Sequence, residues 1–187
     1  MDFFEITSSR YSHKERFLSE PIPFDDLKKI ADAGLSAPSG ANRQTVRLII
    51  LPTREAVDPI YNVSPTVGLE TAPAAIAVLT DSASTPENAM KFEKEDYSAA
   101  VENMLLAAVA LGYVSLWLDS PYFDEKKQAL AKQVLWIPDT CRLWAVLPIG
   151  KPDGEGSRRE KIPFIERVYA GKYGLFIKRE DRNEQIS

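Results

Sequence analysis

Three polar side chains near the start of the chain are spaced so that they could bind a phosphate group together. Arg10, Ser12 and Lys14 occupy alternate positions, and alternate side chains of an extended segment point the same way. An arginine can donate two parallel hydrogen bonds to a phosphate, a serine adds a hydroxyl and a lysine supplies a point charge. The pattern indicates an anion-binding segment; a solvated polar N-terminus is the alternative for these residues alone.

A second polar segment offers the groups that a planar heterocycle would need. Residues 36–45 read Ser-Ala-Pro-Ser-Gly-Ala-Asn-Arg-Gln-Thr and are dense in turn-forming residues. Asn42 and Gln44 each carry both a donor and an acceptor, which suits the amide-rich edge of a ring. An ordinary turn that leads into a strand is the alternative for this segment.

A third segment, near the other end of the chain, is cationic. Arg158, Arg159 and Lys161 precede the apolar Ile162, so that the cations could close over a phosphate while the apolar residue anchors them. Charge runs of this kind are more often solvated surface. Each segment alone has an ordinary explanation, but the three together indicate a binding site for a phosphate group and a planar ring.

The overall composition limits the partners that these segments could serve. The chain has 187 residues, a formal net charge of −4 and a pI near 5.2, which argues against nucleic acid or an anionic membrane as the main partner. One His and the single Cys141 leave no metal cluster and no disulfide framework. The N-terminus lacks the features of a signal peptide, and no apolar run reaches the roughly 20 residues of a membrane span. We therefore expect a cytoplasmic protein without a metal.

Apolar patterning predicts the elements that position the three segments. Leu27, Ile30 and Leu35 recur at helical spacing, whereas residues 74–80 form a continuous apolar run of strand length. The predicted helices cover residues 24–35, 54–62, Asp96–Leu111 and Asp124–Gln133, and the predicted strands cover Val46–Leu51, Ala74–Thr80, Ser115–Leu118 and Leu143–Ile149. Residues 36–45, 82–95 and 151–161 are predicted loops. The order predicts an α+β class, with a mixed central β-sheet flanked by helices in a single domain over residues 1–187.

Two regions carry more apolar surface than one small sheet can cover. Leu106, Val109 and Ala110 make the second half of the helix over Asp96–Leu111 apolar almost all round. The tail from Pro163 onward is rich in aromatic and aliphatic residues, with no later element to bury them. We therefore predict a homodimer in which the tail, about residues 164–187, packs on the partner subunit.

In their order and spacing, these motifs resemble the nitroreductase-like family of FMN-dependent oxidoreductases. The resemblance covers residues 3–175 and rests on Arg10-Tyr-Ser-His-Lys14, Ala37-Pro-Ser-Gly-Ala-Asn-Arg-Gln44, Thr71-Ala-Pro-Ala-Ala-Ile-Ala-Val78, the stretch from Asp96 to Gly112, Ile149-Gly-Lys-Pro152 and Arg159-Glu-Lys161. It implies the nitroreductase fold, bound FMN, a homodimer, and hydride transfer from NAD(P)H to a small acceptor such as a nitroaromatic or a quinone.

The resemblance also implies a role for each motif residue. Arg10 and Ser12 would hold the FMN phosphate. Lys14 would approach the N1/O2 edge of the ring and act as the catalytic side chain, because negative charge develops there when hydride reaches N5. The other implied cofactor contacts are Pro38, Ser39 and Gly40 along the isoalloxazine from the partner subunit, Asn42 at the ring with Gln44 in support, Asn62 at the ring, the backbone of Leu118 and Asp119 on the N5 side, and Arg159 and Lys161 at the phosphate.

The chain departs from the family pattern in ways that leave the substrate open. The family often continues the Gln with Pro and Trp, whereas this chain has Thr45, Val46 and Arg47. The alternatives are another flavin chemistry of the same fold, such as dehalogenation, flavin breakdown or dehydrogenation of a specific metabolite, and a flavin-binding sensor or carrier without turnover. Neither the physiological acceptor nor the choice between NADH and NADPH follows from the residues.

Overall fold

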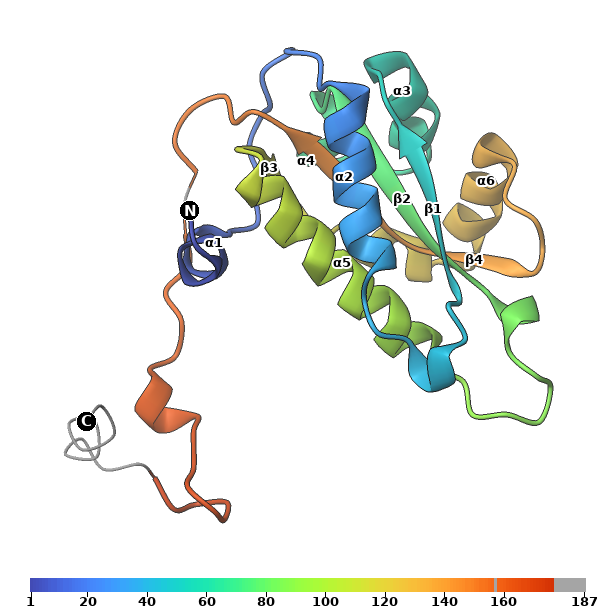
Figure 1. Cartoon of the computed structure of the whole chain (residues 1–187). Coiled ribbons are helices and arrows are strands. Elements are labelled where there is room, and N and C mark those ends of the chain that lie inside the picture. Colours follow the sequence, from blue (N-terminus) through green and yellow to red (C-terminus); the bar gives the residue numbers. More distant parts are fainter. Residues whose placement is uncertain (157, 177–187) are drawn as a thin grey trace. The chain divides into compact units, whose positions relative to one another are not determined.

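Four strands form one sheet in the order β1-β2-β4-β3 in the computed structural model of the chain, which describes residues 1–156 and 158–176 (Figure 1). All three ladders between neighbouring strands are antiparallel. Parallel pairing among the described residues is confined to the isolated bridge between Ser12 and Ser115. The α+β class and the helix-flanked sheet are confirmed. The sheet was predicted to be mixed, but its ladders are antiparallel, and the bridge between Ser12 and Ser115 is its parallel element among the described residues.

The boundaries of the elements follow the predicted ones closely. The strands are β1 Val46–Leu51, β2 Ala74–Asp81, β3 Val114–Ser115 and β4 Cys141–Gly150. The α-helices are α1 Phe3–Ser9, α2 Phe24–Leu35, α3 Arg54–Val63, α4 Val67–Glu70, α5 Glu93–Ala110 and α6 Glu125–Leu135. Four 3₁₀ turns cover Gly40–Asn42, Ser82–Ser84, Ser120–Phe123 and Phe164–Glu166. The helices α1 and α4 were not predicted.

The predicted strand over Ser115–Leu118 was wrong in its length, and a proline explains the difference. β3 ends at Ser115, and Leu118 makes a separate bridge to Val146 in β4. Continuing the β3–β4 register would set Leu116 opposite Pro148. A proline has no N–H to donate to the ladder, so the pairing is interrupted there.

Helices cover both faces of the sheet, and each face carries its own apolar cluster. α2 and α5 lie side by side across one face (Figure 1), where Leu27, Ile30 and Met104 are fully buried. α3 and α6 cover the other face, where Val57 and Ile60 are fully buried. Burying one such side chain contributes about 1.5–3 kcal/mol, so both helical layers are firmly attached to the sheet that positions the loops.

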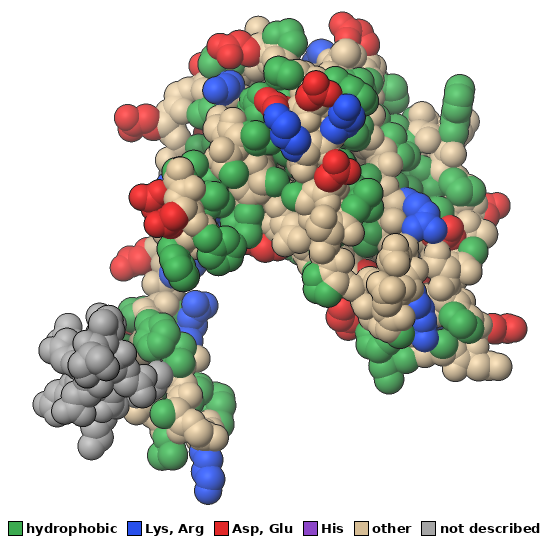
Figure 2. Space-filling view, in the orientation of Figure 1, with side chains coloured by type: hydrophobic (Ala, Val, Ile, Leu, Met, Phe, Trp, Pro, Cys, Tyr) green, Lys and Arg blue, Asp and Glu red, His purple; other side chains and the backbone are tan. Residues whose placement is uncertain are grey.

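The chain comprises two compact units. The first, residues 1–157, contains the sheet and both helical layers, and the second begins at Arg158. Within the second unit the ring of Tyr169 packs against Tyr173 and Phe176, with centroid distances of 4.5 and 4.8 Å. Figure 2 shows apolar side chains on the surface of this unit. The tail predicted to pack on a partner falls in it, and residues 177–187 of that tail lie outside the described residues.

No helix in the described part of the chain has both the length and the apolar composition that crossing a bilayer requires.

Candidate functional site

The segment from Arg10 to Lys14 places two of the predicted ligands outward on either side of a buried histidine. Ser12 and Lys14 are exposed, whereas His13 is only 1% exposed. The backbone N–H of His13 donates to the carbonyl of Ser115 at 3.0 Å, which fixes the segment beside β3. The predicted alternation is therefore present, and it leaves the hydroxyl of Ser12 and the ammonium group of Lys14 accessible to a ligand.

His13 anchors this segment through both ring nitrogens. Its Nε2 lies 2.9 Å from the carbonyl oxygen of Arg16, and its Nδ1 lies 3.5 Å from the hydroxyl of Tyr11. Its ring also makes an edge contact with Phe17 at a centroid distance of 4.7 Å. Sequence reasoning missed this residue, although the same alternation that turns Ser12 and Lys14 outward turns the residue between them inward.

An ion pair with α5 orients Arg10. Its Nε lies 3.4 Å from Oε1 of Glu102, and the two side chains are 22% and 47% exposed. An ion pair this exposed contributes at most about 1 kcal/mol. The contact therefore orients Arg10 without using all of its guanidinium donors, of which an arginine has five.

The second polar segment has an unusual backbone. Ala41, Asn42 and Gln44 all have positive φ angles, of 52, 54 and 50°. Left-handed backbone costs an L-residue other than asparagine or glycine about 1–2 kcal/mol, and such strain persists only where the surroundings impose it. This segment is therefore held in one conformation by contacts from outside it and within it.

Several of those contacts converge on Gly40 and Ser39. The hydroxyl of Ser39 accepts the backbone N–H of Gln44 at 3.0 Å, which closes the segment on itself. The ring of Phe92 lies against Gly40 so closely that a Cβ there would sit 2.2 Å from the ring carbon Cγ. The guanidinium of Arg43 lies 5.9 Å from the centroid of the same ring. Gly40 is thus required by close packing, in addition to any contact with a ligand.

A cavity of about 500 Å³ opens between α2, this segment and β1. Its lining includes the predicted site residues Pro38, Ser39 and Gln44. The other lining residues are Lys28, Ala31, Asp32, Gly34, Leu35, Ala37, Val46, Arg47, Leu48, Ile50 and Asp96.

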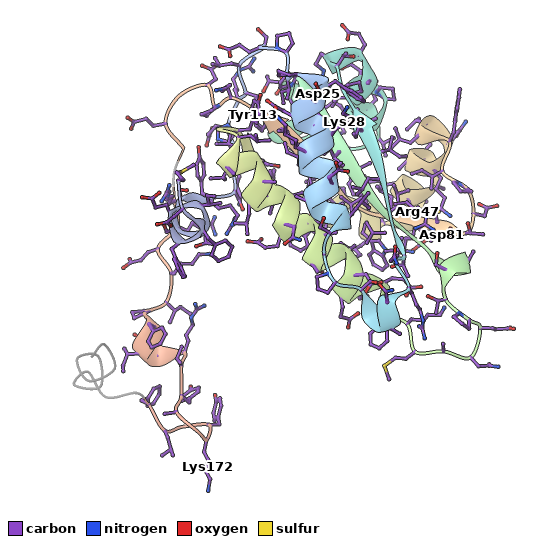
Figure 3. The ribbon with its side chains drawn as sticks, viewed as in Figure 1. Asp25, Lys28, Arg47, Asp81, Tyr113 and Lys172 are labelled. Atoms are coloured by element: carbon purple, nitrogen blue, oxygen red, sulfur yellow. The ribbon has the colours of Figure 1, made fainter. Side chains whose placement is uncertain are left out.

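The two cations of this cavity are already paired. Figure 3 shows Lys28 on α2, near Asp25, and Arg47 on β1, near Asp81; the ion-pair distances are 2.9 and 3.7 Å. The hydrogen bond from Lys28 lowers the pKa of Asp25 below its ordinary value and raises that of the lysine. Since aliphatic side chains make up much of the remaining lining, the cavity suits a flat, mostly apolar ligand with a polar edge.

Three other predicted contacts lie elsewhere in the first unit. Asn62 is exposed on α3, in the layer that covers the opposite face of the sheet from α5. Leu118 uses both backbone groups in its bridge to Val146, at 3.3 and 2.9 Å. The N–H of Leu118 is already donated within the sheet. The predicted backbone contact at Leu118 and Asp119 therefore cannot use this group.

The cationic residues Arg159 and Lys161 belong to the second unit and are exposed. They follow Gly156, against which the ring of Tyr11 packs so tightly that a Cβ on the glycine would lie 2.2 Å from Cε2 of the ring. Within the first unit, Gly156 therefore lies beside Tyr11, the residue that separates Arg10 from Ser12.

Within one chain, the two polar segments of the first unit contact different parts of α5. Arg10 reaches Glu102, and Gly40 reaches Asp96. These two helical positions are six residues apart, which is about 9 Å along the helix and about 120° around it. The two polar segments therefore lie at separate positions along α5 of the same chain.

Comparison with known proteins decides the family. The model of the nitroreductase family matches residues 7–68 and 64–151. The chain belongs to the nitroreductase family. The matched residues include both polar segments of the first unit, whereas the cationic residues Arg159 and Lys161 lie outside them.

Two archaeal relatives and one solved structure illustrate the likeness to the nitroreductase family. A protein of Archaeoglobus fulgidus is 35% identical over 136 residues, which are 72% of this chain and 76% of that protein. A protein of Methanothermobacter thermautotrophicus is 29% identical over 175 residues, 92% of this chain and 88% of that one. Both carry the provisional name NADH dehydrogenase/NAD(P)H nitroreductase. A provisionally named nitroreductase from Desulfovibrio desulfuricans, solved in complex with FMN, superimposes with a TM-score of 0.77 at 24% identity, over 91% of this chain and 96% of that one.

Across residues 1–156 and 158–176, no group of three or more His, Cys, Asp or Glu side chains could hold a metal ion.

Proposed function

We propose that the chain is an FMN-dependent oxidoreductase that transfers hydride from NAD(P)H to a small acceptor, such as a nitroaromatic or a quinone, in the cytoplasm. The observation that carries the proposal is the donor set of the N-terminal segment. Arg10, Ser12 and Lys14 offer two cations and a hydroxyl, and the buried His13 leaves Ser12 and Lys14 exposed. Such a set fits a phosphate monoester and an electron-rich ring edge. The complex of FMN with the Desulfovibrio relative supports the same cofactor.

The residues of this chain would bind and orient the cofactor while leaving the reaction to it. Bound FMN supplies N5, the atom that accepts a hydride and passes it on. Arg10 and Ser12 would bind the phosphate. Lys14 would place its charge beside N1 and O2, where it stabilises the negative charge that develops as the ring is reduced.

The strained second segment would supply the opposite wall of the site from the partner subunit. Pro38, Ser39 and Gly40 would line the ring, and Asn42, with Gln44 in support, would bind its amide edge. A homodimer is part of the proposal because one chain keeps its two polar segments apart along α5. The remaining proposed contacts are Asn62 at the ring, Asp119 and Leu118 near N5, and Arg159 and Lys161 at the phosphate.

The proposal is tested by the chromophore and by hydride transfer. The purified protein is expected to contain about one non-covalent FMN per chain, because the paired cationic clusters suit a monophosphate. Extraction and chromatography of the chromophore measure this, and NADH or NADPH oxidation with a panel of nitroaromatic and quinone acceptors measures turnover. Extracted FAD, or no binding after FMN is added, contradicts the cofactor. Bound FMN without hydride transfer would favour the sensor or carrier, and turnover only with another acceptor class would favour a different flavin chemistry.

Replacing Lys14 with methionine is expected to slow flavin reduction by NAD(P)H while leaving FMN bound. The substitution removes the charge but keeps an unbranched side chain of similar length. The expected effect is a reduction potential lower by about 30 mV, which corresponds to about 1.4 kcal/mol for a two-electron couple. Stopped-flow measurement of the reductive half-reaction and a potentiometric titration check it. An unchanged potential together with weakened FMN binding would make Lys14 a phosphate ligand instead.

A further inference from the structure

A buried carboxylate ties the strained second segment to the start of α5. Asp96 is only 2% exposed. Its Oδ1 accepts the backbone N–H of Gly40 at 2.7 Å, and its Oδ2 accepts the hydroxyl of Thr45 at 2.6 Å. Each carboxylate oxygen therefore holds one end of the segment that runs from Gly40 to Thr45.

Two hydrogen-bond donors and the N-terminal end of α5 stabilise the negative charge of Asp96. In the part of the chain that the structure describes, no Lys or Arg forms an ion pair with it. It lies in the first turn of α5, where the helix carries a partial positive charge, and hydrogen bonds to a carboxylate are strong. A buried carboxylate is costly without such partners, so the energetics of Asp96 depend on the conformation of the segment that it holds.

The residues between the two attachment points are those that strain the backbone. Ala41, Asn42 and Gln44 have positive φ angles, and they all lie between Gly40 and Thr45. If both ends were released, the segment could relax toward ordinary backbone angles. Asn42 and Gln44 would then change direction, because their side chains follow their own backbone.

We infer that Asp96 is a positioning residue for the flavin-facing segment, which it holds from beneath by binding Gly40 and Thr45 together. The inference rests on the proposed function, since it concerns how Asn42 and Gln44 are presented to FMN. Although Asp96 lines part of the cavity, both of its carboxylate oxygens already accept hydrogen bonds from the segment. It acts through the segment, and its loss alters the geometry of the bound flavin before it alters the fold.

The test compares Asp96→Ala and Asp96→Asn with the unaltered protein. Asp96→Ala removes both acceptors, whereas Asp96→Asn keeps one carbonyl oxygen for Gly40 and can donate its amide to the oxygen of Thr45. Alanine is expected to raise the Kd for FMN about tenfold and to change the visible circular dichroism of the bound flavin. It should also speed hydrogen exchange at the Gly40 amide in the apoprotein. In the asparagine variant, the Kd for FMN, the flavin dichroism and the exchange at the Gly40 amide should all lie close to those of the unaltered protein.

Gln128→Met is the matched control for a general loss of stability. Gln128 is 3% exposed, and its side-chain amide donates to the carbonyls of Tyr122 and Leu143 and accepts from the N–H of Leu143. It thus ties α6 to β4 on the other face of the sheet. This substitution removes comparable buried hydrogen bonds, and it should lower the melting temperature without changing the flavin dichroism or the Gly40 exchange.

The outcomes separate this inference from the proposed function. If the unaltered protein binds no FMN, the proposed function is wrong, and so is the role of Asp96 in presenting Asn42 and Gln44 to FMN. If FMN binds but Asp96→Ala leaves the dichroism and the Gly40 exchange unchanged, only the inference is overturned. Should Asp96→Ala not fold, Thr45→Val removes one attachment alone, with Thr45→Ser as its rescue. Equal flavin dichroism and affinity in these two variants would also overturn the inference.

Discussion

Replacing Arg10 with alanine is expected to weaken FMN binding by about 2–4 kcal/mol, since it removes a charge-assisted contact to the phosphate. That loss corresponds to about a 30- to 900-fold increase in Kd. The side chain pairs with Glu102 on α5, and Arg10 is not a member of either buried apolar cluster of the first unit, so its removal should leave the core intact. Titration of apoprotein with FMN, followed by flavin fluorescence, measures the change. The binding of the unaltered protein should also weaken with added salt, because ions screen exposed charges.

Glu102→Gln is the control that separates the two roles open to Arg10. It removes the ion pair on α5 and leaves the guanidinium in place. Because the pair is exposed, the variant should lose at most about 1 kcal/mol of stability and bind FMN close to normally. If Arg10→Ala binds FMN as tightly as the unaltered protein, Arg10 only pairs with Glu102 and is no phosphate ligand.

The elements that sequence patterning predicted best are those whose residues are decided by local periodicity. α2 and β1 have the predicted limits, because the apolar stripe of α2 and the apolar run of β1 can both be read from the local sequence. α1 was missed, although Asp2 and Glu5 form a capping box around its start, a pattern visible in the sequence. The length of β3 could not be predicted, since it depends on the register with β4, which would set Leu116 opposite Pro148.

The candidate site shows the same division between local and long-range causes. The outward alternation of Ser12 and Lys14 follows from spacing alone. The hydrogen bonds of Asp96 reach Thr45 and Gly40, which lie 51 and 56 positions away in the sequence. No local sequence pattern predicts such contacts. The positive φ angles at Ala41 and Gln44 were also hidden, because neither position carries the glycine that usually marks such a backbone.

Truncation after Lys161 is expected to abolish both dimerisation and flavin binding. Within the first unit, Leu106, Val109 and Leu111 at the end of α5 are only partly buried, and the removed tail carries apolar side chains of its own. A dimer that covers both is expected to bury more than about 2,000 Å². Because such a subunit has little stability alone, the melting temperature of the full chain should rise with protein concentration. Light scattering, flavin absorbance and melting curves at several concentrations measure the three effects.

Lys172→Ala provides the matched change within the same tail. Lys172 is exposed (Figure 3) and takes part in a local turn through its backbone N–H, which donates to Ala170. Removing its side chain takes away a charge and leaves the aromatic and aliphatic residues of the tail in place, so the variant should stay dimeric and yellow. The truncated chain is expected to be monomeric and colourless, because each flavin would then lack the wall supplied by Ser39 and Gly40 of the other subunit. A full-length, flavin-loaded monomer of 20.9 kDa would refute the shared site. A truncated protein that remains dimeric and binds FMN would keep the shared site and remove the tail from it.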